Sequence, residues 1–203
     1  MKEIDRRYDI LKNYVAGKRD WSRTTLENIN LKGAILKEIN LNNSCLIEVN
    51  LHSCNLTKST LETSNLHDCN LENSCLKEAN FTKANLERVN LRNSHLEKAK
   101  FYQTYLKNAD LTGAYLRGAD LRGACLEGAK LNDAFLAGAI YDESTVFDRN
   151  FSVTETEMVS VKSSQKLTTD RVRKIDRAED KSQAVPAFFK VIKKTLQVTK
   201  FAS

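Results

Sequence analysis

The residues best suited to metal binding, redox chemistry or nucleophilic catalysis are three histidines and five cysteines: His52, His67, His95, Cys45, Cys54, Cys69, Cys75 and Cys125. None of them forms a Cys-x-x-Cys or His-x-x-His pair, the spacing with which most zinc sites begin. The sequence also lacks a glycine-rich phosphate loop, a nucleophile elbow and a convincing pair of catalytic carboxylates. We therefore expect no enzyme activity, no metal and no cofactor.

These side chains must be positioned by a repeat of five residues. A leucine or phenylalanine stands at every fifth position of residues 26–136, which makes 23 central positions in one register. Most units carry a small residue two places before the centre and Asn or Asp one place before it. A period of five fits neither an α-helix, at about 3.6 residues per turn, nor a strand, at about 2. The chain must therefore turn a corner in every unit.

Residues 109–113 and 119–123 read A(D/N)LXX, and this pattern resembles the pentapeptide-repeat family. The resemblance implies an all-β solenoid, a right-handed quadrilateral parallel β-helix in which four units make one coil. The central residue and the small residue two before it would point inward, and every twentieth residue would stack vertically. Glycines two places after the centre, such as Gly113, would then occupy corners where the backbone needs a positive φ.

On such a fold the cysteines would lie too far apart for disulfides. Cys54 and Cys69 would point inward on different faces, and Cys45 and Cys125 would share a column but lie four coils, about 19 Å, apart. We expect reduced, structural thiols. One outward column consists of amides that we expect to hydrogen-bond from coil to coil: Asn30, Asn50, Asn70 and Asn90.

The ends of the repeat predict a cap and a tail. Between residues 3 and 16 the apolar residues that would cover the first coil recur at helical spacing, before a stop at Gly17: Ile4, Tyr8, Leu11 and Val15. Trp21 would take the first central position, and Tyr141, Val146 and Phe151 keep the five-residue phase. We expect a capping helix over residues 1–17, the β-helix over 18–152, and a linker with a basic tail over 153–203.

The basic charge of the chain lies in that tail. Residues 153–203 hold 11 basic and 6 acidic residues, whereas residues 1–152 hold 21 and 20. We expect the tail to be partly helical or disordered, with a basic amphipathic helix over residues 186–200. Seven of its residues are candidates for an interaction: Phe188, Phe189, Lys190, Ile192, Lys193, Lys194 and Leu196.

Four aromatic residues should point outward in the C-terminal half of the repeat: Tyr102, Tyr105, Tyr115 and Phe135. Exposed rings on neighbouring coils favour a docking surface for another protein. Alternatively, the chain's own tail, which begins nearby, covers them. The sequence leaves both possibilities open.

The family resemblance implies two kinds of function. Some pentapeptide-repeat proteins resemble DNA in shape and charge and protect type II topoisomerases, but their columns are strongly acidic, whereas this one is nearly neutral. Others, especially cyanobacterial ones, act as regulators through protein contacts, including one that promotes heterocyst differentiation. We therefore expect a non-enzymatic protein-interaction or scaffold module with a protein partner, and we disfavour a DNA mimic and direct nucleic-acid binding.

The main alternative is a peripheral membrane adapter whose tail helix lies on an anionic membrane surface. No stretch is apolar for long enough to span a membrane, and the N-terminus lacks the apolar core of a secretory signal. We therefore expect a cytoplasmic location. The sequence leaves open whether the protein is a monomer or a homodimer.

Overall fold

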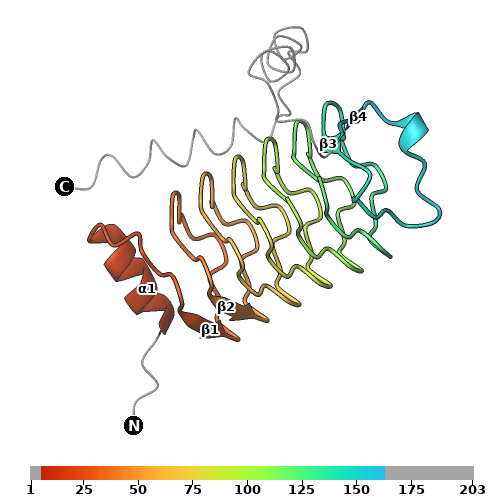
Figure 1. Ribbon diagram of the computed structural model, residues 1–203. Coiled ribbons are helices and arrows are strands. Elements are labelled where there is room, and N and C mark those ends of the chain that lie inside the picture. The colour runs from red at the N-terminus through yellow and green to blue at the C-terminus, as the bar shows by residue number, and fades with distance from the viewer. Residues whose placement is uncertain (1–5, 163–203) are drawn as a thin grey trace, which may run out of the picture. The chain divides into compact units, whose positions relative to one another are not determined.

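The computed structural model of the protein describes residues 6–162. Its elements follow one another as α1 (Arg6–Val15), β1 (Thr25–Glu27), β2 (Cys45–Ile47), β3 (Ile140–Tyr141), the 3-10 helix η1 (Val153–Glu155) and β4 (Val159–Ser160). Between β1 and β3 the chain winds into stacked coils (Figure 1). No helix within residues 6–162 is both long and apolar enough to cross a membrane.

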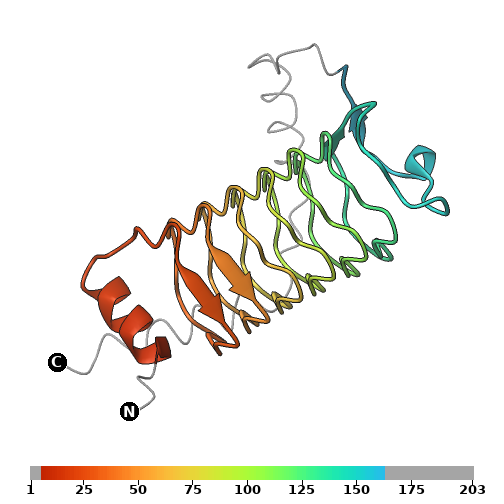
Figure 2. The same cartoon turned by 60° about the horizontal axis from the view of Figure 1, so that its bottom comes forward.

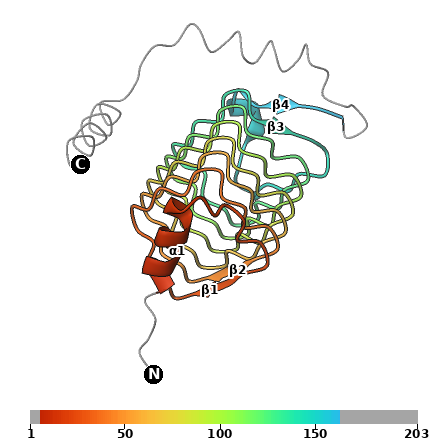
Figure 3. The ribbon, with the colours of Figure 1, turned by 90° about the vertical axis from the view of Figure 1, so that its left-hand side faces the viewer.

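Successive coils pair in parallel with a register of twenty residues, as the repeat predicts. β1 pairs with β2 so that Leu26 lies beside Leu46, and the same shift continues through single bridges along the column. At each bridge the backbone exchanges two hydrogen bonds, for example Leu31 N to Asn50 O at 2.8 Å and Asn50 N to Ile29 O at 2.9 Å. Twenty residues hold four five-residue units, so each coil has four faces, and Figure 3 shows coils of similar outline one behind another.

We number the faces in chain order by the outward residue that precedes each central residue. The columns of outward residues run from Asp20 to Ile140 on face 1, from Thr25 to Cys125 on face 2, from Asn30 to Lys130 on face 3 and from Ile35 to Phe135 on face 4. β1 and β2 lie side by side on face 2 (Figure 2).

The interior of the column is a continuous stack of leucines, and most of its central residues are fully buried. Phe81 and Phe101 take two central positions one coil apart, with ring centroids 5.3 Å apart. Buried hydroxyls in the small inward position donate to backbone carbonyls, as Ser59 Oγ does to Leu56 O at 2.6 Å. A polar side chain is therefore tolerated there, because its hydrogen bond is satisfied inside.

The Asn or Asp before each centre folds the corner that follows. Its side-chain oxygen accepts a hydrogen bond from the backbone N–H two residues later, as Asn65 Oδ1 does from His67 at 3.2 Å. The predicted amide ladder on face 3 is replaced by these bonds, which Asn50 and Asn70 make to their own corners. A coil-to-coil amide bond occurs on face 2 instead, from Asn85 Nδ2 to Asn65 Oδ1 at 3.1 Å.

α1 closes the N-terminal end of the column, and Leu11 is the one described residue of the predicted face that packs against the core. Ile10 is 3% exposed and belongs to the core, and Leu11 and Tyr14 pack against it. Tyr8 and Val15 are 61% and 85% exposed, so the prediction that they cover the first coil is wrong. The remaining member of the predicted face, residue 4, lies outside the described residues.

The helix ends and enters the repeat as predicted. Gly17 has a φ of 94°, and the Lys18 N–H bonds to the carbonyl of Asn13 at 2.9 Å, which closes the helix end. Trp21 then donates its backbone N–H to Asn40 O at 2.7 Å, in the register of a central residue.

The five-residue phase breaks after Ile140, which the sequence did not predict. Cys125 pairs with Val146, a shift of 21 residues, so one extra residue enters the coil. Val146 therefore points outward and is 51% exposed, while Phe147 packs against the core. The prediction that Val146 keeps the central phase is wrong.

Asp142 holds this extra residue in place. The residue is 5% exposed, and its carboxylate accepts hydrogen bonds from the backbone N–H groups of Gly123 and Ser144, both at 3.1 Å, and from the Ser144 hydroxyl at 2.6 Å. Burial acts to raise the pKa of Asp142, but the hydrogen bonds from Ser144 and Gly123 outweigh it and hold the pKa below its usual value.

Pairing also continues beyond the expected end of the column. β4 lies parallel to β3, with Ile140 beside Val159 and Tyr141 beside Ser160. The first ten residues of the predicted linker are therefore not a linker, because they carry η1 and the last paired strand.

Candidate functional site

Face 4 carries a ladder of three stacked aromatic rings, which we call the face 4 ladder: His95, Tyr115 and Phe135. His95 and Tyr115 have ring centroids 4.7 Å apart and planes within 5°, and Tyr115 and Phe135 repeat this geometry. Consecutive coils are about 4.8 Å apart, so the register itself sets rings at stacking distance. Phe135 ends the ladder with 55% of its surface exposed.

The four predicted aromatic residues do not form one surface. Tyr115 and Phe135 share face 4, but Tyr105 pairs with Asn85 and Cys125 on face 2. Ten residues, half a coil, separate Tyr105 from Tyr115, so the two rings point to opposite sides of the column. The prediction of a single docking surface is therefore wrong, because only Tyr115 and Phe135 of the four residues share a face.

Tyr102 lies at a third place, the corner that follows the central residue Phe101. Its ring centroid is 5.7 Å from the Arg122 guanidinium carbon, and Arg122 in turn donates two hydrogen bonds to Asp120, at 2.8 and 2.6 Å. Tyr102 is thus engaged with a paired arginine on its own corner. It contributes nothing to the face 4 ladder.

Two residues of face 4 were missed as candidates. His95 completes the ladder, and Ile35 stands 52% exposed in the same column near the other end. The signal that would have found both is the twenty-residue stack, because residues 35, 95, 115 and 135 differ by multiples of twenty.

The lower end of the ladder rests on a charged pair. The carboxylate of Glu97 lies 2.7 Å from Lys77 Nζ and 3.4 Å from His95 Nδ1. Burial acts to raise the pKa of Glu97, but hydrogen bonds from His95 and Lys77 outweigh it and lower the pKa. These contacts orient the His95 ring, and the rings of Tyr115 and Phe135 stack parallel to it.

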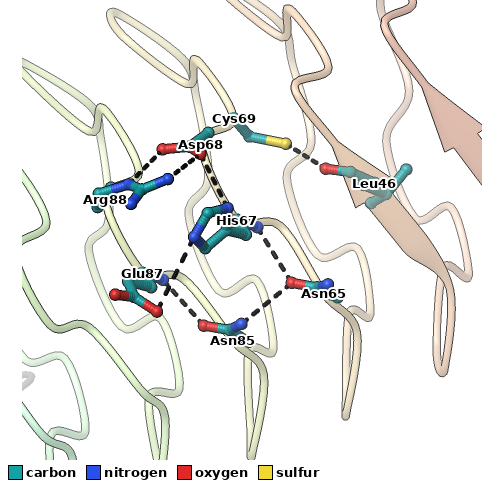
Figure 4. A network of polar contacts seen from close by, with 8 residues as sticks. All are labelled: Leu46, Asn65, His67, Asp68, Cys69, Asn85, Glu87 and Arg88. Atoms are coloured by element: carbon teal, nitrogen blue, oxygen red, sulfur yellow. Dashed lines mark hydrogen bonds and ion pairs between the residues drawn. The ribbon is translucent and has the colours of Figure 1, made fainter.

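A second polar cluster surrounds His67 at the corner between faces 2 and 3 (Figure 4). His67 Nδ1 lies 2.9 Å from Asp68 and its Nε2 lies 3.9 Å from Glu87. Arg88, one coil along, donates two hydrogen bonds to Asp68, at 2.8 and 2.5 Å, and these hold the pKa of Asp68 below its usual value. The ion pair between Arg88 and Asp68 joins two adjacent coils, so the cluster braces them.

The cysteines take the positions that the register predicts. Cys54 and Cys69 are buried, and burial raises the pKa of Cys54 to about 11 and that of Cys69 to about 12. Both thiols therefore stay protonated at neutral pH and are unreactive. All five cysteines are free, and within residues 6–162 no three His, Cys, Asp or Glu side chains gather as a metal site.

The candidates in the tail, from Phe188 to Leu196, lie outside the described residues.

Comparison with known families agrees with the repeat. A model described as a pentapeptide repeat region matches residues 19–96, and a model of pentapeptide repeats matches residues 94–133 in eight copies. This chain belongs to the pentapeptide-repeat family. Membership implies the right-handed quadrilateral β-helix that the A(D/N)LXX units predict, and the twenty-residue pairing of the coils agrees with it.

Solved pentapeptide-repeat proteins resemble this one. Rfr23 from the cyanobacterium Cyanothece 51142 is 29% identical with a TM-score of 0.50, over 59% of this chain and 91% of its own. A pentapeptide-repeat protein from Nostoc Pcc 7120 is 27% identical over 76% of this chain and 94% of its own, with a TM-score of 0.35. One from the Arabidopsis thaliana thylakoid lumen is 26% identical over 47% and 70%, with a TM-score of 0.39. No curated protein matches the sequence.

Proposed function

We propose that this pentapeptide-repeat protein is a non-enzymatic protein-interaction module that docks a partner on face 4. The observation that carries the proposal is the face 4 ladder, three rings aligned in one column and ending in the exposed Phe135. Proteins of this family are generally non-catalytic interaction proteins, which supports the same reading.

The ladder suits docking because it is rigid before a partner arrives. Each ring is held by the ring on the next coil, and His95 is held by Glu97. Association therefore costs little side-chain entropy at these positions. Aromatic residues on a preformed surface are the residues that contribute most to binding energy in protein interfaces.

Affinity capture from native lysate tests the proposal with single substitutions. Tyr115→Ser or Phe135→Ser should weaken capture of the partner by about fivefold or more, because each removes a ring from the surface. Tyr105→Ser is the matched control, since it removes an exposed ring from the opposite side. Equal loss for all three variants, or no loss, contradicts docking on face 4.

The membrane adapter remains an alternative that depends on residues outside 6–162. A truncation that tests it should end after Gln165, where the first compact unit ends, because a cut at residue 152 would remove β4 and its pairing with β3. If the truncated protein still sediments with anionic vesicles, the tail is not the membrane contact. The cytoplasmic location stays a prediction.

A further inference from the structure

Among the described residues, 6–162, the edge of the last coil finds backbone partners on only two of its four faces. On face 1, β4 covers the coil, with Val159 N to Ala139 O at 2.7 Å. On face 2 the strand containing Val146 covers it, with Val146 N to Ala124 O at 2.9 Å. On faces 3 and 4 the coil is the last to form bridges, through Lys130 and Phe135.

The unpaired groups on those two faces are the ones that the coil below uses. One coil earlier, Leu111 N bonds to Lys130 O at 2.8 Å and Leu116 N bonds to Phe135 O at 2.9 Å. Within residues 6–162, the corresponding N–H groups of Leu131 and Leu136 find no backbone acceptor. The carbonyls of residues 129 and 134 likewise accept no backbone hydrogen bond from this part of the chain. An unpaired edge of this kind is a template for another strand.

Apolar surface accompanies the open edge. Leu111 is fully buried, whereas Leu131, at the same place one coil later, is only half-buried, and so are Ala129 and Ala134. The segment that could have covered them, residues 148–157, leaves the coil as a wide loop that carries η1 (Figure 2). Phe151 from this loop stacks on Phe147, with ring centroids 5.0 Å apart, and covers part of the interior.

The residues that repeat on face 4 indicate which side chains a further strand would need. Residues 94–96, 114–116 and 134–136 read Ser-His-Leu, Ala-Tyr-Leu and Ala-Phe-Leu, which is a small residue, a planar ring and a leucine each time. One side of the Phe135 ring packs on Tyr115. A further strand that repeats this triplet would place a ring on the other side of Phe135, at about 4.8 Å.

The charge of this end of the column restricts the partner further. Residues 127–160 hold seven acidic and two basic residues, whereas residues 1–126 hold 15 acidic and 19 basic residues. Asp133 and Glu127 lie exposed at corners of the last coil. A negative end attracts a basic segment and repels an acidic one.

We propose that the open edge on faces 3 and 4 binds an extended, basic segment of a partner protein, which adds to the column as one more strand. The segment carries a small residue, an aromatic residue and an aliphatic residue in succession. Backbone hydrogen bonds to Leu131 and Leu136 hold the segment, and stacking of its aromatic residue on Phe135 makes the binding selective. This inference rests on the proposed interaction function and names the class of partner.

The test uses the full-length protein and a synthetic peptide, acetyl-Lys-Lys-Leu-Asn-Gly-Ser-Tyr-Leu-Lys-Lys-amide, whose second lysine and tyrosine are five residues apart, as Lys130 and Phe135 are. Binding should slow hydrogen exchange at the amides of Leu131 and Leu136 and leave the amides of the central coils unchanged. Phe135→Ala should weaken binding about two- to tenfold, because a stacked ring is lost. Ile35→Ala, at a site of similar exposure on the same face but far from the edge, should have no effect. Replacing the four peptide lysines by glutamate should abolish binding.

Three results would overturn the proposal: no added protection at Leu131 and Leu136, equal binding of the glutamate peptide, or sedimentation showing that a second copy already pairs with the edge. Failure here is distinguishable from failure of the proposed function. If the peptide does not bind but lysate capture still depends on Tyr115, the face 4 ladder remains a docking surface and only the edge is excluded. If the peptide binds but lysate capture is indifferent to Tyr115, the side of the face 4 ladder is excluded as a docking surface and only the edge at Phe135 remains.

Discussion

At the scale of single residues, the corner two places after each centre is the most demanding position of the repeat. All 24 such corners of residues 23–138 have positive φ, and eighteen of them are not glycine. Each non-glycine residue there costs about 1 kcal/mol relative to an ordinary conformation. The column accepts this cost because the turn lets the next strand pair with both neighbouring coils.

Alanine substitutions at two glycine corners separate the cost of a positive φ from the cost of a steric clash. Gly33→Ala should destabilise the protein by about 1 kcal/mol, because φ is +73° but a Cβ there would meet no atom within 4 Å. Gly113→Ala should cost about 2 kcal/mol, because its Cβ would also meet Asn93 Oδ1. Urea unfolding gives both values, and combining Gly113→Ala with Asn93→Ala should recover the difference. Equal costs for the two glycines would show that Asn93 moves aside freely.

The central leucines should contribute different amounts to the free energy of unfolding, depending on their place in the column. Leu76 is fully buried between coils, so Leu76→Ala should cost about 2–5 kcal/mol. Leu131 is half-buried at the open edge, so Leu131→Ala should cost less than half as much. Thermal unfolding followed by circular dichroism compares them. A similar cost for both would mean that the edge at Leu131 is covered in solution.

At the scale of elements, α1 and the segment after Ile140 show what a local pattern leaves out. The five-residue period predicted the coils, their twenty-residue register and the inward cysteines, because one repeated geometry controls them all. The docking face of α1 was mispredicted because the helix has apolar residues on more than one side, and contact with the first coil selected Ile10. The extra residue near Asp142 was not predicted, because the hydrogen bonds that hold it leave no periodic pattern in the sequence.

The cap should protect the first coil against exchange and self-association. Ile10→Asp places an unpaired charge in a site that is 3% exposed, so α1 should detach and expose the first coil. Faster hydrogen exchange at Leu31 and an increase in sedimentation coefficient would report this. Val15→Asp is the control, because Val15 is 85% exposed and its substitution should change neither quantity.

The face 4 ladder illustrates what a candidate site needs beyond composition. Tyr115 and Phe135 were identified from the outward register alone, yet grouping them with Tyr105 ignored the half coil between them. The twenty-residue stack that separates the cysteines also places His95 in the ladder and Tyr105 on the far side. The open edge could not be predicted, because it depends on where residues 148–157 leave the column.

At the scale of the whole molecule, the column should lose stability in acid. The Arg88 guanidinium holds the pKa of Asp68 below its unfolded value of about 3.9. The stabilisation is therefore complete above that value and is lost as pH falls through the lower, folded pKa. Lowered pKa values are also found for Asp20, Asp110, Asp142 and Asp148. Their contributions to folding stability are therefore lost over the same acidic range.

Urea midpoints between about pH 2 and pH 6 measure this dependence. Asp68→Asn should be less stable than the parent at pH 6 and should lose less stability on acidification. Asp133→Asn, the same substitution at an exposed corner, is the matched control. A parent slope in Asp68→Asn would mean that the contact with Arg88 contributes nothing to folding.

The twenty-residue register turns chain length into orientation. Removing one unit of five residues before Phe135 would turn everything beyond the cut by a quarter revolution and carry its ring from face 4 to face 3. Removing four units would leave every face where it was and lower the far end by about 4.8 Å. The direction in which an outward residue points therefore depends on how many five-residue units precede it, and it repeats after every fourth unit, whatever residues those units contain.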